Sequence, residues 1–224
     1  MAAAQLYARG TSSDGVSLAG GSGSGLCIEG DARAGRSLGV RTEVTDVPAP
    51  EAAQLMRMLL GEMWATLGEH LGEDARESET ILSTRFGGWD VRERLAGIEQ
   101  ALVALGNRVG RALQSGRDLE VTFVPRLALA EPPKVPGDLD PDLLLRRASQ
   151  AVEHFARRIE VLSPAQERHP CRSEDGLFTV HGLVLEALCR LRAHVAGIVA
   201  AVDNANRRRQ WLASRNAHVA PLPA

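Results

Sequence analysis

Aromatic residues, cysteine and lysine are all scarce in this chain of 224 residues. Phe, Trp and Tyr make up 4% of it, so aliphatic side chains must supply most of the packing. Its three cysteines, Cys27, Cys171 and Cys189, are an odd and widely spaced set, which excludes the disulfide framework of a small secreted domain. Lys134 is the only lysine, so nearly all basic residues are arginines, and we attribute this imbalance to GC-rich codon usage.

The chain also has no excess of charge of one sign. It carries 26 basic and 28 acidic residues, which leaves a formal net charge of −2. No overall electrostatic field would therefore draw the protein to nucleic acid or to an anionic membrane. The hydrophobic content of 44% and the charged content of 24% are typical of a globular protein. A chain of this length can bury a sizeable core as one large domain.

No apolar run is long enough to span a bilayer. The longest candidate, residues 183–202, is interrupted by Glu186, Arg190, Arg192 and His194. The first ten residues lack the basic and apolar regions of a secretory signal peptide. We therefore expect a cytoplasmic protein with no transmembrane segment.

Residues 1–47 form a region of different character, a Gly/Ser-rich arm with short β-strands. Residues 26–29 and 38–44 contain alternating apolar residues and are separated by turn-forming residues at 31–36, a pattern typical of short antiparallel strands. For residues 1–25 the sequence does not decide between further strands and a flexible arm.

Residues 48–224 are predicted to be a helical bundle. Apolar residues recur every three or four positions in four segments, which is the spacing of a single helix face. The segments are 51–71, 91–113, 141–162 and 177–211. In the first of them the apolar stripe consists of Leu55, Leu59, Met63 and Leu67. Helices with one apolar stripe are not stable alone, so these four must pack against each other.

The connections between these helices contain one further predicted strand. Residues 119–124 alternate with a period of two, whereas residues 125–141 form a proline-rich connector that cannot be helical throughout. Residues 163–176 are predicted to be a loop. The predicted fold class is α+β, a mainly helical bundle of about four helices with a small antiparallel sheet. That sheet is formed by the N-terminal strands and the strand near 119–124, and the chain forms one structural domain overall.

A phosphate-binding loop is the first kind of site that the sequence suggests. Residues 20–25 are rich in glycine, but a phosphate loop requires a preceding buried strand and a following helix. An extended segment follows here and the Gly-Lys-Ser/Thr sequence is missing, so we interpret the glycines as a turn or linker.

Metal binding is the second possibility, because several ligand-type residues occur near the C-terminus. They are His169, Cys171, His181, Cys189 and His194. Structural zinc sites gather closely spaced ligand pairs, and these residues lack that spacing. We favour packed histidines and core cysteines over a zinc site.

Catalytic groups are equally hard to assemble. No Gly-x-Ser-x-Gly elbow is present, and Cys171 beside His169 is the only Cys–His pair, placed in a polar loop. The carboxylate pairs lie in polar segments where side chains are usually solvated; they are Glu73 with Asp74, Glu174 with Asp175, and Asp138 with Asp140. We predict no enzyme, with no catalytic, cofactor-binding or metal-binding residues.

The basic cluster Arg207, Arg208 and Arg209 next to Trp211 is the remaining candidate. Because it lies near the predicted end of a long helix, we favour stabilisation of the negative end of the helix dipole. Arginines beside an aromatic ring are also typical of a contact surface for an acidic protein or for RNA.

One stretch resembles a known family. Residues 132–145, Pro-Pro-Lys-Val-Pro-Gly-Asp-Leu-Asp-Pro-Asp-Leu-Leu-Leu, are similar to the proline-leucine-aspartate-leucine-leucine segment that opens a helix in the Rogdi family. The order of predicted elements between residues 26 and 202 is also similar. The chain departs from the family in its Gly/Ser-rich arm, where members have a helical stretch, and in its few aromatic residues. The resemblance implies a scaffold subunit of the RAVE-type complex, which promotes assembly of the vacuolar proton-pumping ATPase.

The sequence therefore predicts a non-enzymatic protein-interaction or assembly subunit of a larger complex. Its expected partners are other proteins, and nucleic acid or a small-molecule substrate is less expected. The alternative is a nucleic-acid-associated helical protein that uses the basic C-terminal helix. A third hypothesis is a zinc-stabilised domain or hydrolase around His169, Cys171 and His181.

Overall fold

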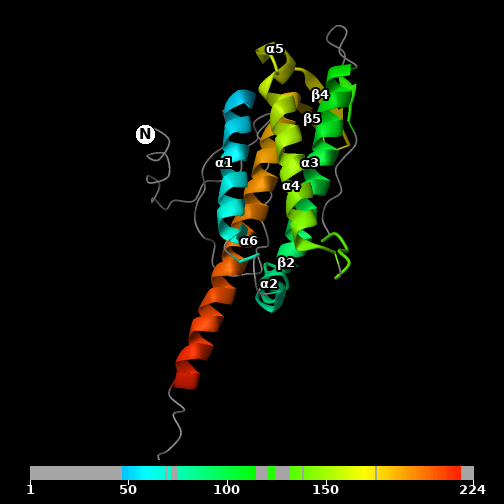
Figure 1. Ribbon diagram of the computed structural model, residues 1–224. Coiled ribbons are helices and arrows are strands. Elements are labelled where there is room, and N and C mark those ends of the chain that lie inside the picture. Colours follow the sequence, from blue (N-terminus) through cyan, green and yellow to red (C-terminus); the bar gives the residue numbers. More distant parts are fainter. Residues whose placement is uncertain are drawn as a thin grey trace, which may run out of the picture.

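The computed structural model describes residues 47–68, 70–71, 75–114, 121–124, 132–137, 139–174 and 176–217. The strands predicted within residues 1–46 lie outside this described part. The predicted fold class is confirmed, because the protein is α+β with four long helices packed together and small sheets beside them (Figure 1).

Four helices form the bundle. They are α1 (Ala49–Gly68), α3 (Val91–Gln114), α4 (Pro141–Glu160) and α6 (Val180–Ala217). Both α1 and α3 pack against α4 and α6. In Figure 1, α3 and α4 run in the direction opposite to α1 and α6. Since α3 and α4 are parallel, the end of α3 and the start of α4 lie at opposite ends of the bundle.

The core is a single cluster of aliphatic side chains. Leu102 and Leu191 are 2% and 1% exposed, and Phe155 is the only aromatic among the largest fully buried side chains of the described residues. In α1 only the second half of the predicted stripe is buried. Met63 and Leu67 are buried as expected, whereas Met56 and Leu60 occupy the centre and Leu55 and Leu59 only pack at its border. Met56, Leu60, Met63 and Leu67 are spaced by four, three and four residues, which keeps them on one face, whereas a strict spacing of four drifts around a helix of 3.6 residues per turn.

A three-stranded sheet lies at the end of the bundle where α1 begins. Its strands are β3 (Thr122–Phe123), β4 (Pro170–Ser173) and β5 (Gly176–Thr179), in the order β3-β4-β5. The strand predicted near 119–124 is therefore confirmed at 122–123. Its described neighbour is β4, which runs parallel to it, and β4 pairs antiparallel with β5. The loop predicted at 163–176 is wrong, because it contains β4, the start of β5 and a short helix.

Several short elements are not predicted by the sequence patterns. They are α2 (Ala75–Leu82), the hairpin of β1 (Arg85–Phe86) and β2 (Trp89–Asp90), and α5 (Pro164–Glu167). Gly87 and Gly88 form the hairpin turn with φ angles of 59° and 84°, a conformation that glycine adopts without strain. A reciprocal capping box between Ser163 and Gln166 begins α5. Among the described helices, none has both the length and the apolar composition that crossing a membrane requires.

Candidate functional site: the projecting end of α6

The last helix continues far beyond the bundle (Figure 1). Its contacts with the body are still present at Ala205, which is 8% exposed, and at Asn206, whose Nδ2 lies 3.4 Å from Nε2 of His70. From residue 207 to residue 215 every side chain is exposed. At a rise of about 1.5 Å per residue, residues 207–217 extend the helix by roughly 16 Å.

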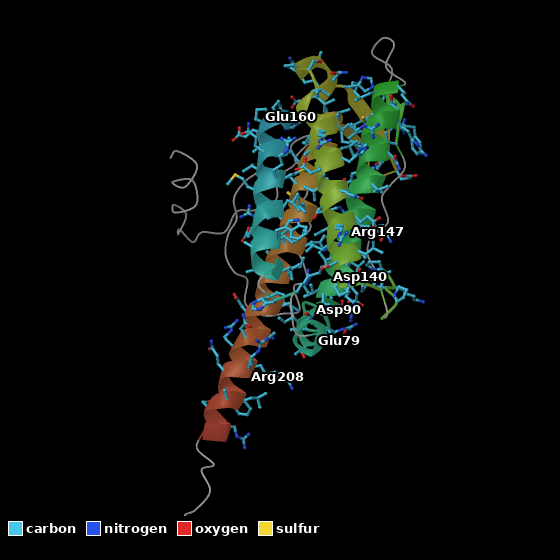
Figure 2. All side chains as sticks on the ribbon, viewed as in Figure 1. Glu79, Asp90, Asp140, Arg147, Glu160 and Arg208 are labelled. Atoms are coloured by element: carbon cyan, nitrogen blue, oxygen red, sulfur yellow. The ribbon has the colours of Figure 1, made fainter. Side chains whose placement is uncertain are left out.

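This projecting end, residues 207–215, is strongly basic. Arg207, Arg208, Arg209 and Arg215 are its charged residues, and the sequence has no acidic residue between positions 204 and 217. Figure 2 shows Arg208 on this part of the helix, away from the bundle. A protein with a net charge of −2 thus concentrates positive charge at one end.

Two large apolar side chains accompany the arginines. Trp211 is 55% exposed, and the guanidinium carbon of Arg215 lies 4.9 Å from the centre of its ring, a cation–π contact. Leu212 is 46% exposed and follows Ala205 by seven positions, so it continues the stripe that the bundle buries further up. Positions 207, 211 and 215 share another face of the helix because they are four residues apart.

The position of the arginines contradicts the interpretation favoured from sequence. We expected Arg207, Arg208 and Arg209 to stabilise the end of the helix dipole, but α6 ends only at Ala217. The dipole effect is confined to the last turn, and Arg215 is the basic residue found there. Helix capping therefore does not explain the three consecutive arginines.

The metal-ligand candidates are not brought together. Nε2 of His169 lies 3.2 Å from the Thr122 hydroxyl, and Nδ1 of His181 lies 3.1 Å from a carboxylate oxygen of Glu167. The ring of His194 packs against Trp89 with ring centres 5.2 Å apart. Within the described ranges, no three His, Cys, Asp or Glu side chains are grouped so that they could hold a metal ion.

Cys171 lies in β4 and not in the polar loop that the sequence predicts. The side chain is fully buried, and burial raises the pKa of the thiol to about 11 although the charge of Arg108 acts in the opposite direction. A protonated thiol is a poor nucleophile. The sulfur lies 3.7 Å from the backbone carbonyl oxygen of His169, whereas the His169 ring contacts Thr122, so the Cys–His pair considered from the sequence is not formed.

Of the carboxylate pairs noted in the sequence, one member has a clear structural role. Asp140 is the N-cap of α4, where its side chain accepts a hydrogen bond of 3.0 Å from the backbone N–H of Asp142. Asp138, its neighbour in the noted pair, lies outside the described residues, as do Glu73, Asp74 and Asp175.

Buried arginines are the site that sequence reasoning missed. Arg94 of α3 is 8% exposed, and its guanidinium packs against Gly197 of α6 and donates to the backbone carbonyl of Phe86. Burial lowers the pKa of Arg94, and it also lowers the pKa of the adjacent His194 to about 4. These contacts fasten the β1–β2 hairpin to the bundle. The signal in the sequence was the presence of Gly97 and Gly197 in otherwise well-formed helical stripes.

The surface also contains two open hollows. One, of about 720 Å³, runs between α3 and α4 and includes Arg147, which forms a 2.9 Å ion pair with Glu99. The other, of about 350 Å³, lies where α2 meets the start of α4 and includes Glu79, which is ion-paired with Arg92. Arg147 is paired with Glu99 in the first hollow and Glu79 with Arg92 in the second. We therefore assign no ligand to either hollow.

Comparison of the chain with models of known protein families, with curated proteins and with solved structures finds no match.

Proposed function

We propose that this protein is a non-enzymatic protein-interaction or assembly subunit of a larger complex. In this proposal the projecting end of α6, residues 207–215, binds an acidic surface of a partner protein. The observation that carries the proposal is the combination of four arginines with exposed Trp211 and Leu212 on a helix end that leaves the bundle.

The residue types support a protein partner with carboxylates on its surface. Arginine and tryptophan dominate the energetic centres of protein interfaces. A guanidinium binds a carboxylate through two parallel hydrogen bonds, which gives both affinity and orientation. Trp211 and Leu212 would supply the apolar contact that such an interface needs at its centre.

The energetics of the helix also support a partner. A helix of about eleven residues is marginally stable in water on its own, because most helical stability in proteins comes from tertiary packing. Beyond Asn206 the described side chains of α6 gain little from the bundle, since all of them are exposed. A partner that covers one face would stabilise this end in the same way as the bundle stabilises the rest.

We further propose that the complex is of the Rogdi type and acts in the cytoplasm on assembly of a vacuolar-type proton pump. The resemblance of residues 132–145 to that family's helix-opening segment supports this. Consistent with it, α4 begins at Pro141 with Asp140 as its N-cap. The strand at 122–123 precedes the connector and two long helices follow it, as the resemblance implies.

Capture of partners by the full-length tagged chain tests the proposal. The variant Arg207→Glu, Arg208→Glu, Trp211→Ala changes the proposed surface. The matched control Arg146→Glu, Arg157→Glu, Leu143→Ala makes the same kinds of change at exposed positions of α4. We expect proton-pump or pump-assembly subunits to co-purify with the unchanged chain. Their yield should fall at least about tenfold with the α6 variant and less than about twofold with the control. Equal yields for both variants would refute the assignment of the surface.

A nucleic-acid-binding function is the second candidate, and the contact of Arg215 with Trp211 is what favours it. A filter-binding titration with RNA at low salt distinguishes the two, because phosphate contacts are strongest there. We expect no retention of RNA. Retention that disappears in the α6 variant would replace the proposed function by this alternative.

A further inference from the structure

The ring of His194 lies where α6, the start of α3 and the β1–β2 hairpin meet. It packs against the ring of Trp89 in β2, with ring centres 5.2 Å apart. On the side of α3 it meets Gly97, where an added Cβ would lie 2.8 Å from Cε1 of His194 and 2.9 Å from the Trp89 ring. The glycine therefore lets the imidazole and the indole pack together directly on α3.

This site suits the neutral imidazole and not the charged one. Nδ1 of His194 is buried, and it has no hydrogen-bond partner in the part of the chain that the structure describes. A neutral ring can leave this nitrogen as an unused acceptor, whereas both nitrogens of an imidazolium carry protons and require acceptors. Protonation would therefore bury an N–H without an acceptor, which costs free energy.

The positive charges around the ring also oppose protonation. Burial is the main cause that lowers the pKa of His194 to about 4, and the charges of Arg94 in α3 and Arg190 in α6 add to it. Arg94 is itself 8% exposed, and its buried Nε has no hydrogen-bond partner among the described residues. The closed site thus holds two groups that water would solvate better.

The acidic side chains of the adjoining elements already have partners. Asp90, which ends β2, and Glu93 of α3 accept hydrogen bonds of 2.8 Å from each other's backbone N–H groups (Figure 2 labels Asp90). Arg85, the other charged residue of the hairpin strands, is paired with Glu93. On α6, Glu186 is paired with Arg190. Each of these carboxylates would have to leave its partner to neutralise an imidazolium at position 194.

The β1–β2 hairpin is the element at this site that moves most easily. Its strands have two residues each, and a hairpin of that size is not stable alone. It is fastened by the Trp89 contact and by the hydrogen bond from Arg94 to the backbone carbonyl of Phe86, whose side chain is exposed. Because the hairpin buries little apolar surface, moving it costs less than opening the bundle.

The core of the bundle does not respond to acid in the same way. Its buried cluster consists of hydrophobic side chains, which carry no group that takes up a proton between pH 7 and pH 4. The thiol of Cys171, whose pKa burial raises, is protonated throughout this range. A fall in pH therefore acts on the contact of the hairpin before it acts on the core.

We propose that the β1–β2 hairpin opens from the bundle when His194 takes up a proton, while the four long helices stay packed. In the open form Trp89 leaves the imidazole, and water supplies the acceptor for Nδ1 that the closed form lacks. Water then also solvates the guanidinium of Arg94. This inference does not rest on the partner proposed for α6.

The difference in proton affinity determines how strongly acid favours the open form. The open form takes up the proton with the ordinary pKa of 6.5, and the closed form does so only with a pKa of about 4. Between these pH values the ratio of open to closed molecules rises by up to about tenfold per pH unit, and by roughly 300-fold in total.

Acrylamide quenching of Trp89 fluorescence measures the opening. In the full-length chain, Trp64→Phe and Trp211→Phe leave Trp89 as the single tryptophan, and both replaced side chains are exposed. We expect the quenching rate constant of Trp89 to rise at least about threefold between pH 7 and pH 4.5, because an open hairpin exposes the indole. Far-UV circular dichroism should show unchanged helix content over the same range.

Two histidine variants in this single-tryptophan chain assign the effect. His194→Gln keeps a polar side chain that cannot become charged, so the quenching rate constant should be equal at the two pH values. His154→Gln, at an exposed position of α4, is the matched control and should retain the full rise.

Three results would overturn the inference. The first is a quenching rate constant that stays the same between pH 7 and pH 4.5. The second is a rise that accompanies loss of helix content, or that is steeper than about tenfold per pH unit, because unfolding of the bundle takes up several protons. The third is a full rise in His194→Gln. Should His194→Gln fail to fold, the first two results still decide.

Discussion

The buried guanidinium of Arg94 depends on the absence of a side chain at the residue that faces it. A Cβ added at Gly197 would overlap the guanidinium atoms, and Arg94 is held in place by Phe86 and surrounded by the bundle. We therefore expect Gly197→Ala to reduce the free energy of unfolding by about 2 kcal/mol, the usual cost of overpacking a core. Urea denaturation measures it.

Gly61→Ala is the matched control for this prediction. Gly61 lies inside α1, and a Cβ added there would have no neighbouring atom within 4 Å, so alanine should stabilise the helix by about 0.5–1 kcal/mol. Equal effects of the two substitutions would show that Arg94 is not confined by Gly197.

His194 should make the stability depend on pH. Its Nδ1 is buried without a hydrogen-bond partner in the described part of the chain. Burial, reinforced by the charges of Arg94 and Arg190, lowers the pKa of its ring from 6.5 to about 4. Between these pH values the unfolded chain binds a proton that the folded protein does not, so stability falls as pH falls.

The expected loss between pH 7 and pH 4.5 is about 2–3 kcal/mol in the free energy of unfolding. His194→Gln should flatten this part of the profile, measured by urea denaturation at each pH. An unchanged slope in the variant would assign the pH dependence to other groups. The carboxylates of Glu79 and Glu160, whose pKa values are lowered by their arginine partners, contribute mainly below this window.

Residue-scale prediction from sequence succeeded where burial follows periodicity. Leu102 and Leu191 belong to repeating stripes and are buried. It failed for Arg94 and Cys171, because charged residues are usually exposed and a polar neighbourhood in sequence does not reveal which strand will cover a side chain. Burial of these two depends on elements brought together only by the tertiary fold.

At the scale of elements, the N-terminus of α4 is stabilised by one N-cap residue, Asp140. Asp140→Ala removes the acceptor for the N–H of Asp142 and should cost about 1 kcal/mol of unfolding free energy. Asp140→Asn retains a capping oxygen and should stay within a few tenths of a kcal/mol of the unchanged protein. Thermal or urea unfolding of both variants provides the test, and equal destabilisation would mean that the carboxylate acts through something other than capping.

The long helices could be predicted because each repeats its apolar pattern over several turns. Most of the short elements could not, for different physical reasons. Strands β4 and β5 have four residues each, too few for a clear period. The alternation of residues 119–124 did predict β3, but its parallel pairing with β4 joins segments about fifty residues apart and has no local signal. The Gly87–Gly88 hairpin did carry a local signal, since two glycines between apolar residues favour a tight turn.

The exposed basic end of α6 could be predicted as a set of residues but not as a surface. The sequence makes the basic cluster conspicuous, namely Arg207, Arg208 and Arg209 with Trp211. It does not show how far these residues lie from the end of the helix. Periodicity ends near residue 211 because the bundle no longer buries that part of the helix. Because the helix continues to Ala217, the arginines lie on its exposed side and not at its C-terminal end.

At the scale of the whole molecule, one contiguous core holds all four long helices. Leu191 of α6 is 1% exposed and lies in this core. Leu191→Asp would bury an unpaired charge, so we expect a loss of about 4 kcal/mol or more and a largely unfolded chain. Leu143→Asp, at a position that is 42% exposed, should cost less than about 1 kcal/mol. Far-UV circular dichroism with urea denaturation distinguishes them, and a folded Leu191→Asp protein would contradict the single-core description.

The molecule thus has two ends with different surfaces. The sheet and the entry of the chain are at one end, and the basic extension of α6 is at the other (Figure 1). A subunit that joins other proteins can use such an arrangement, because a surface outside the core can bind without disturbing the fold.

Amide hydrogen exchange of residues 207–215, in the free full-length chain and in the co-purified complex, tests the proposed contact most directly. In the free protein these amides should exchange rapidly, because a helix end without tertiary packing opens easily. In the complex their exchange should slow by at least about tenfold, while amides in the buried part of α6 stay unchanged. Equal exchange rates for residues 207–215 in the free chain and in the complex would contradict the central claim that this end of α6 is where the partner binds.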